Sequence, residues 1–81
     1  MTSKQRRVYL TLCEQAMIAG SCPTVRTLAA LLGMSVSNTH RYLAQLAARR
    51  YVQLPATNRK RVKILIWPQQ EDDRTERSRE Q

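Results

Sequence analysis

The side chains best suited to chemistry are hydrogen-bond donors and cations that gather in residues 36–50. If this segment is helical, its outer face presents five polar residues: Ser37, Asn38, His40, Arg41 and Gln45. A guanidinium on such a face can form paired hydrogen bonds to guanine O6 and N7 in the DNA major groove. We therefore predict base readout here, with Arg41 at the centre as the leading contact. His40 lies at the edge of this face, where it can contact a base, contact a phosphate or remain exposed to solvent.

A second group of cations lies in a polar segment between two expected strands. The run Asn58-Arg59-Lys60-Arg61, followed by Lys63, places four positive charges near a hairpin tip. Such a tip can meet the phosphate backbone or enter the minor groove. Thr24 and Ser35 are predicted helix N-caps, and helix N-termini attract anions, so each is also a candidate phosphate contact, as is Arg26.

The sequence holds no comparable group of residues for acid–base or metal chemistry. Glu14 is the single acidic residue among residues 1–70, and the chain holds one histidine, so the sequence offers no acid–base or nucleophile pair. Cys13 and Cys22 lack the spacing of a zinc site and are too few for a disulfide framework. We expect no enzyme activity, no metal, no cofactor and no small-molecule effector.

The charge of the chain fits a polyanionic partner. Fourteen Lys and Arg residues stand against six Asp and Glu residues in 81 positions, for a net charge of +8. Residues 1–70 hold 11 basic and one acidic residue, or +10, whereas residues 71–81 hold three basic and five acidic residues, or −2. No apolar run approaches the roughly 18 residues of a membrane span, and the N-terminus lacks the apolar stretch of a signal peptide. These features predict a cytoplasmic protein.

The hydrophobic pattern predicts three helices that would position these side chains. Apolar residues at helical spacing predict a helix over residues 3–19. Its buried stripe is expected to hold Tyr9, Leu12, Cys13, Ala16 and Met17. A second helix is predicted over residues 25–32 and a third over residues 36–50. Gly20 and Gly33 end the first two helices, because glycine adopts the left-handed conformation of a helix C-terminus.

After residue 50 the hydrophobic period changes to two, which is typical of strands. We expect strands over residues 51–54 and 62–67, joined by a polar loop, with a wing over residues 55–63. Residues 69–81 are wholly polar and are expected to form a disordered tail behind one domain of residues 1–68. Three helices followed by a basic hairpin predict an α+β winged helix-turn-helix, with a wing of two to three strands.

Two motifs resemble those of known bacterial regulators. The run from Cys22 to Ala29, CPTVRTLA, resembles the opening of helix two in LexA-type repressors, and the run from Gly33 to Leu43, GMSVSNTHRYL, resembles the recognition-helix entry of IclR, MarR and LexA regulators. LexA-type sequences usually have one more residue at the start of helix three and an acidic residue where Thr27 stands. Their self-cleavage domain has no counterpart in this sequence. The resemblance implies double-stranded DNA binding without release by cleavage.

The leading hypothesis is a small transcriptional repressor of phage or plasmid type that binds double-stranded DNA, as a homodimer, since repressors commonly read two half-sites. A DNA-bending accessory factor of recombination or replication would share the same features. A winged-helix module that binds an acidic protein is the third possibility. Asn38 and Tyr42, together with the later Trp67, also resemble the recognition-helix residues of domains that bind left-handed nucleic acid. The paired prolines of that family's wing are missing from this sequence.

Overall fold

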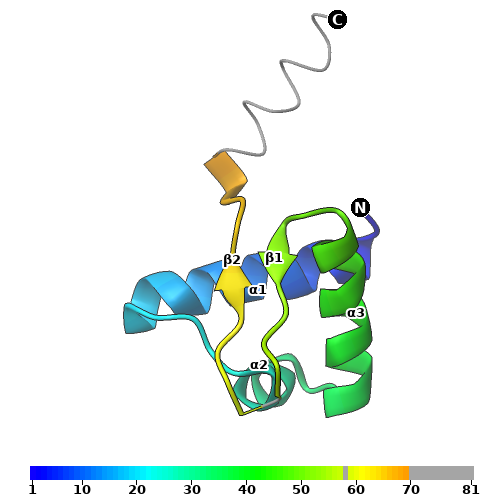
Figure 1. Cartoon of the computed structure of the whole chain (residues 1–81), viewed down its shortest axis with the longest axis vertical. Helices are drawn as coiled ribbons and strands as arrows, with labels where there is room; N and C mark the ends of the chain where they lie inside the picture. Colours follow the sequence, from blue (N-terminus) through cyan, green and yellow to red (C-terminus); the bar gives the residue numbers. More distant parts are fainter. Residues whose placement is uncertain (58, 70–81) are drawn as a thin grey trace, which may run out of the picture.

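Three helices precede a short antiparallel hairpin, and the computed structural model describes residues 1–57 and 59–69. The elements are α1 (Ser3–Ala19), α2 (Val25–Leu32), α3 (Val36–Ala48), β1 (Val52–Gln53) and β2 (Lys63–Ile64). Figure 1 shows α2 and α3 packed on one side of the long α1, with the hairpin beside α3. This arrangement is the predicted α+β winged helix-turn-helix.

Each helix begins at a side-chain cap: Thr24 and Ser35 are the predicted caps, and Thr2 is one that was not predicted. The hydroxyls of Thr2, Thr24 and Ser35 accept hydrogen bonds from the backbone N–H three residues later, which satisfies donors that have no partner inside the helix. At Thr2 the bond is reciprocal, because the Gln5 side chain accepts from the Thr2 N–H at 3.0 Å. The predicted bounds of the first two helices, 3–19 and 25–32, are confirmed.

The third helix is shorter than the sequence predicts. We expected it to run to Arg50, but it ends at Ala48, and Arg50 has a φ of +64°. The N–H of Arg50 bonds to the carbonyl of Ala47 at 2.9 Å, and the N–H of Tyr51 bonds to the carbonyl of Leu46 at 3.0 Å. This pair of bonds is a Schellman motif, which ends a helix through one left-handed residue.

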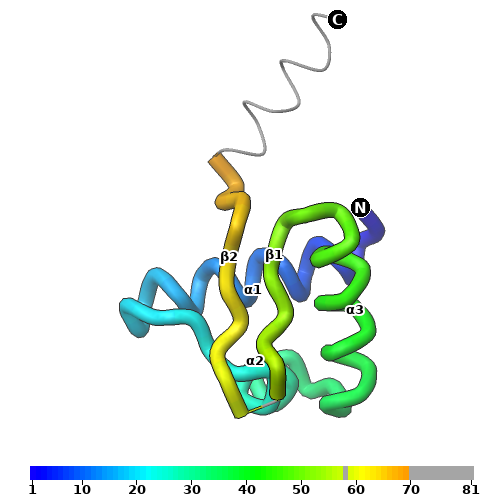
Figure 2. Tube along the Cα trace, viewed as in Figure 1, coloured from blue at the N-terminus to red at the C-terminus, as the bar shows by residue number. Residues whose placement is uncertain are grey.

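The hairpin is also shorter than predicted. Its paired residues are Val52 with Ile64 and Gln53 with Lys63, so the predicted strands 51–54 and 62–67 were too long. The N–H groups of Leu65 and Ile66 both bond to the carbonyl of Tyr51, at 2.9 and 3.1 Å, and this shared acceptor ends the regular ladder. Figure 2 shows the two arms of the hairpin running alongside each other past the start of α2.

A third extended segment joins the hairpin at the link between α1 and α2. Thr24 forms an isolated antiparallel bridge with Arg61, and the N–H of Val62 bonds to the carbonyl of Pro23 at 3.1 Å. The predicted two- to three-stranded wing is therefore a two-stranded hairpin with one additional bridge. The bridge fixes the wing, residues 55–63, against the start of α2.

One hydrophobic core holds the helices and the hairpin together. Its members come from every element: Val8, Tyr9, Leu12, Cys13, Ala16, Val25, Leu28, Leu32, Leu43, Leu46, Val52, Val62 and Ile64. Tyr9 is fully buried, donates its hydroxyl to the carbonyl of Ile66, and meets the Tyr51 ring edge-on at 5.3 Å. These contacts connect α1 to both arms of the hairpin.

The prediction that Met17 belongs to the buried stripe is wrong, because its side chain is 76% exposed. The residues that α1 buries are Gln5, Val8, Tyr9, Leu12, Cys13 and Ala16. On a helix with 100° between residues, this stripe is centred close to Leu12 and Ala16, and Met17 lies at its flank. Figure 1 also shows the last turn of α1 extending beyond the elements that pack on it.

The chain after the hairpin is described only as far as Gln69. Of the predicted disordered tail, residues 69–81, all but Gln69 lies outside the described residues, so that prediction stays untested. Among the helices of residues 1–57 and 59–69, none is long and apolar enough to cross a membrane.

Candidate nucleic-acid interface

The five residues predicted to read bases lie on the exposed side of α3. The opposite side is anchored in the core by Thr39, Leu43 and Leu46, each fully buried. The exposed residues are Ser37, Asn38, His40, Arg41 and Gln45. Because the buried side is locked by packing, the exposed side is presented by a rigid helix rather than by a mobile loop.

Arg41 and Asn38 contact each other on this face. The Nη2 of Arg41 donates to the Oδ1 of Asn38 at 3.3 Å, and the Arg41 guanidinium lies 5.9 Å from the centre of the Tyr42 ring. The bond is long, so Arg41 is oriented by its neighbours but is easily released to another acceptor. The amide of Asn38 also remains beside the guanidinium, so the two residues form a joint hydrogen-bonding surface.

Gln45 is connected to the first helix. The Nε2 of Gln5 donates to the Oε1 of Gln45, and Gln5 is itself 8% exposed and part of the cap of α1. Because the amide oxygen of Gln45 is engaged, its NH₂ group is the part left to offer to a ligand. The flank of α3 that carries Gln45 is thereby fixed against the start of α1.

A basic groove lies between the start of α3 and the wing. Arg26 of α2, Val36 at the start of α3, and Thr57 and Arg59 of the wing line a groove of about 570 Å³. Two guanidinium groups therefore border the N-terminus of α3, where backbone N–H groups and the helix dipole also favour an anion. The groove brings together two predicted phosphate contacts, Arg26 and Arg59, that are far apart in the sequence.

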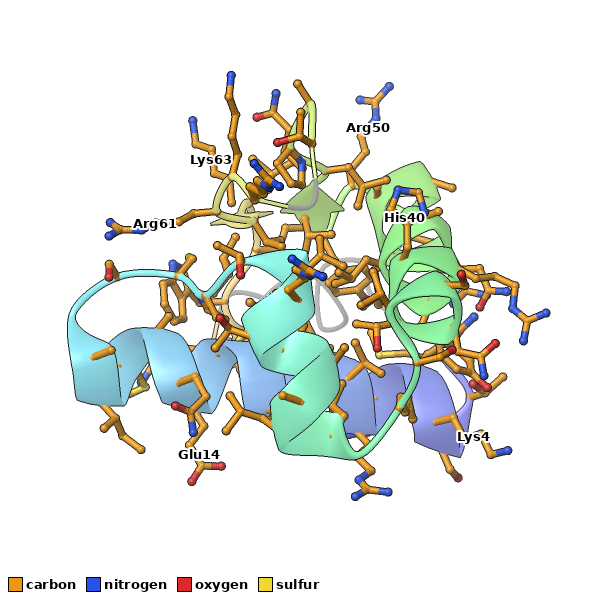
Figure 3. The ribbon with its side chains drawn as sticks, turned by 90° about the horizontal axis from the view of Figure 1, so that it is seen from below. Lys4, Glu14, His40, Arg50, Arg61 and Lys63 are labelled. Carbon is orange, nitrogen blue, oxygen red and sulfur yellow. The ribbon has the colours of Figure 1, made fainter. Side chains whose placement is uncertain are left out.

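The other predicted phosphate contacts are less closely grouped. Arg61 lies on the bridge to Thr24 and lines a separate groove with Cys22 and Thr27, and Figure 3 shows it pointing away from α3. Thr24 and Ser35 are confirmed as caps, since their hydroxyls accept from the N–H groups of Thr27 and Asn38 at 3.1 Å.

Lys60 and Lys63 are exposed on the wing, and the backbone N–H of Lys60 closes a turn onto the carbonyl of Thr57 at 3.2 Å. The prediction for Asn58 lies outside the described residues. The wing therefore directs Arg59 toward α3 and Arg61 away from it, rather than presenting one continuous basic tip.

Arg50 is a further surface cation near this site, one that no sequence pattern singled out. Figure 3 shows Arg50 and Lys63 extending from the same side of the molecule, with His40 on the neighbouring side of α3. The one acidic residue among residues 1–69, Glu14, lies on the opposite side. Figure 3 also shows Lys4 of α1 on the side of Glu14, whereas Arg50 and Lys63 lie on the side that carries the hairpin.

Comparison with known proteins supports a helix-turn-helix assignment. Residues 18–55 match the family model of the IclR helix-turn-helix domain, which spans the end of α1, the whole of α2 and α3, and β1. No curated protein and no solved structure matches the chain at a significant level. The matched segment includes α3 and the turn that leads into it, on which the predicted base contacts lie, whereas the predicted wing contacts at residues 58–63 lie outside it.

Proposed function

We propose that this DNA-binding transcription regulator, which carries an IclR-type helix-turn-helix domain in a winged fold, is a sequence-specific repressor. In this proposal α3 enters the major groove and the wing lies on the phosphate backbone or in the minor groove. Repression follows from occupancy, because a bound protein excludes polymerase from the same stretch of duplex. No effector domain is needed for that mode of action.

The exposed face of α3 is the observation that carries the proposal. Arg41 and Asn38 share a hydrogen bond there at 3.3 Å, and the flanking residues Ser37, Ala44 and Ala48 are small. Small neighbours let the helix approach base edges closely, and a guanidinium can then form paired bonds to guanine. Phosphate contacts from the basic groove would set the register of α3 but would carry no sequence information.

The wing and α2 supply the proposed backbone contacts unequally. Arg26 and Arg59 border the groove next to the start of α3, whereas Arg61 points away from α3. If one duplex lies against α3, Arg59→Ala lowers the slope of log affinity against log salt by about 0.9. Arg61→Ala changes the slope less, so the two single variants form a matched pair.

We further propose that two copies pair through the exposed side of α1. Met17 and Ile18 are 76% and 71% exposed, and they line a largely apolar groove together with Leu10, Glu14 and Pro68. Each copy carries +10 over residues 1–70, and Glu14 is the single acidic residue of that part. The described lining of this groove contains Glu14 and no cation, so two copies that meet through it bring fewer like charges together than copies that meet through the basic groove.

Sedimentation velocity tests the pairing. Met17→Gln combined with Ile18→Gln is expected to convert a dimer to a monomer and leave the fold intact. Leu31→Gln, which changes a 48% exposed leucine on α2, is the matched control and leaves the dimer unchanged. A parent protein that stays monomeric at micromolar concentration, with and without DNA, contradicts the pairing.

Footprinting on the DNA upstream of the protein's own gene tests the repressor proposal. The expected result is a protected site that survives competition by random duplex, with an affinity that falls steeply as salt rises. Protection that requires a strongly bent duplex would favour the accessory-factor role instead. Absence of any salt-dependent duplex binding would overturn the proposal and favour an acidic protein partner.

A further inference from the structure

Arg50 adopts a backbone conformation that is costly for its side chain. Its φ is +64°, and it is the one residue other than glycine with a positive φ among residues 1–57 and 59–69. A side chain in this left-handed region brings Cβ close to the following carbonyl. Gly20 and Gly33 hold the same conformation at the ends of α1 and α2, with φ of +76° and +68°, so the chain uses glycine at the other two positions.

No contact within the folded protein explains the arginine. Its side chain is exposed, and within the part of the chain that the structure describes no hydrogen bond or ion pair holds its guanidinium. A cation at a helix C-terminus does interact favourably with the helix dipole. Arg49 already provides that charge at the preceding position, with an ordinary φ of −91°.

The position of Arg50 relative to the wing indicates what it meets. Arg50 lies just beyond the C-terminal end of α3, which ends at Ala48. Figure 3 shows Arg50 on the same side as Lys63 of the wing, which is one of the predicted phosphate contacts. A phosphate backbone that lies along this side would meet both cations.

We propose that Arg50 binds a DNA backbone phosphate on the side of the domain that also carries Lys63, and that its strained conformation is kept for this contact. The inference rests on the proposed function, since it requires α3 to lie in a major groove. Residues in strained backbone conformations are concentrated at binding sites. The guanidinium geometry suits a phosphate, which accepts two parallel hydrogen bonds.

Arg50→Gly tests the inference because stability and binding are expected to change in opposite directions. Glycine relieves the backbone, so the melting temperature rises by about 3 to 6 °C for a domain of this size. Loss of one phosphate contact lowers the affinity for duplex at 0.1 M salt by about eightfold, equally on specific and random DNA, and reduces the salt slope by about 0.9. Arg50→Lys keeps the charge and the strain, and retains the parent's melting temperature and salt slope.

Arg49→Ala is the matched control, because it removes the same charge one residue earlier without changing a strained position. It is expected to keep the parent's salt slope and to show no gain in melting temperature, with a small loss because the cation at the helix C-terminus is removed. Equal losses of affinity in the Arg49 and Arg50 variants would contradict a specific contact at Arg50 and indicate a diffuse effect of charge at the end of α3.

An Arg50→Gly protein that binds DNA like the parent would overturn the inference, and so would one without a gain in melting temperature. Both results leave the proposed function standing if the parent binds a specific duplex. If the parent binds no duplex, the proposed function itself has failed.

Discussion

The turns that precede and follow α3 have the same backbone geometry but opposite chemistry. Before α3, the N–H groups of Gly33 and Met34 bond to the carbonyls of Ala30 and Ala29 at 3.3 and 3.0 Å. After α3, Arg50 and Tyr51 make the corresponding bonds to the end of that helix. The left-handed residue before α3 is Gly33, where an added Cβ would have nothing within 4 Å. The left-handed residue after α3 is the exposed Arg50.

The comparison separates a turn optimised for folding from a turn that carries a functional side chain. At Gly33 the residue type fits the conformation, so the turn sets the angle between α2 and α3 at little cost. At Arg50 the conformation is set by its neighbours, since Tyr51 bonds to α3 through its N–H and to Leu65 and Ile66 through its carbonyl. The second turn therefore depends on tertiary contacts that the first does not need.

Removing the Tyr51 side chain is expected to give the largest loss of stability. Its ring packs edge-on against Tyr9 at 5.3 Å and contacts the core, so Tyr51→Ala leaves a cavity beside a buried aromatic. We expect a loss of about 3 kcal/mol in the free energy of unfolding. Urea denaturation measures it, with Tyr51→Phe as the control that keeps the ring. A loss below about 1 kcal/mol, less than such truncations usually cost, would show that the second turn holds itself without tertiary support.

Gly33→Val is expected to destabilise the first turn by about 2 kcal/mol, because a β-branched residue is strongly disfavoured at positive φ. A Cβ at this position meets nothing within 4 Å, so the cost is conformational rather than steric packing. Gly33→Asn is the control, since asparagine tolerates the left-handed region and loses less. Equal stability of the valine variant and the parent, measured by thermal denaturation, would remove the distinction between the two turns.

Tyr9→Phe is expected to give a smaller loss, of about 1 kcal/mol, because it removes one hydrogen bond and keeps the ring. The hydroxyl of Tyr9 donates to the carbonyl of Ile66, close to where the second turn meets the hairpin. Thermal denaturation gives the stability, and hydrogen exchange of the Leu65 and Ile66 amides shows whether the loss is local. An unchanged exchange rate at both amides would mean that this bond does not support the second turn.

The same contrast explains what could be predicted from the sequence. Gly33, Thr24 and Ser35 mark their own boundaries, because glycine, threonine and serine are the residue types that helix ends and caps prefer. These boundaries were predicted correctly. Arg50 carries no such signal, so the predicted helix ran two residues too far.

Contacts between segments far apart in the chain could also not be predicted from the sequence. The bond of Gln5 to Gln45 joins residues 40 positions apart, and the groove between Arg26 and Arg59 forms only when the wing folds back toward α2. The amphipathic pattern did place the polar face of α3 correctly, since helical periodicity alone decides which residues oppose Leu43 and Leu46. Which wing cations face α3 depends on the bridge between Thr24 and Arg61, which no local pattern encodes.

Binding by the Arg41→Ala variant tests most directly whether α3 reads DNA bases. Arg41 is exposed and opposes the buried face of α3, so its removal is expected to change stability by no more than about 0.5 kcal/mol. The measurement is a titration of parent and variant on the footprinted site and on its single-base variants, at one salt concentration. We expect a loss of about 1 to 3 kcal/mol on the specific site and a relaxed preference at one base pair. Equal losses on every duplex would make Arg41 a phosphate contact, and no loss on any of them would contradict base readout by α3.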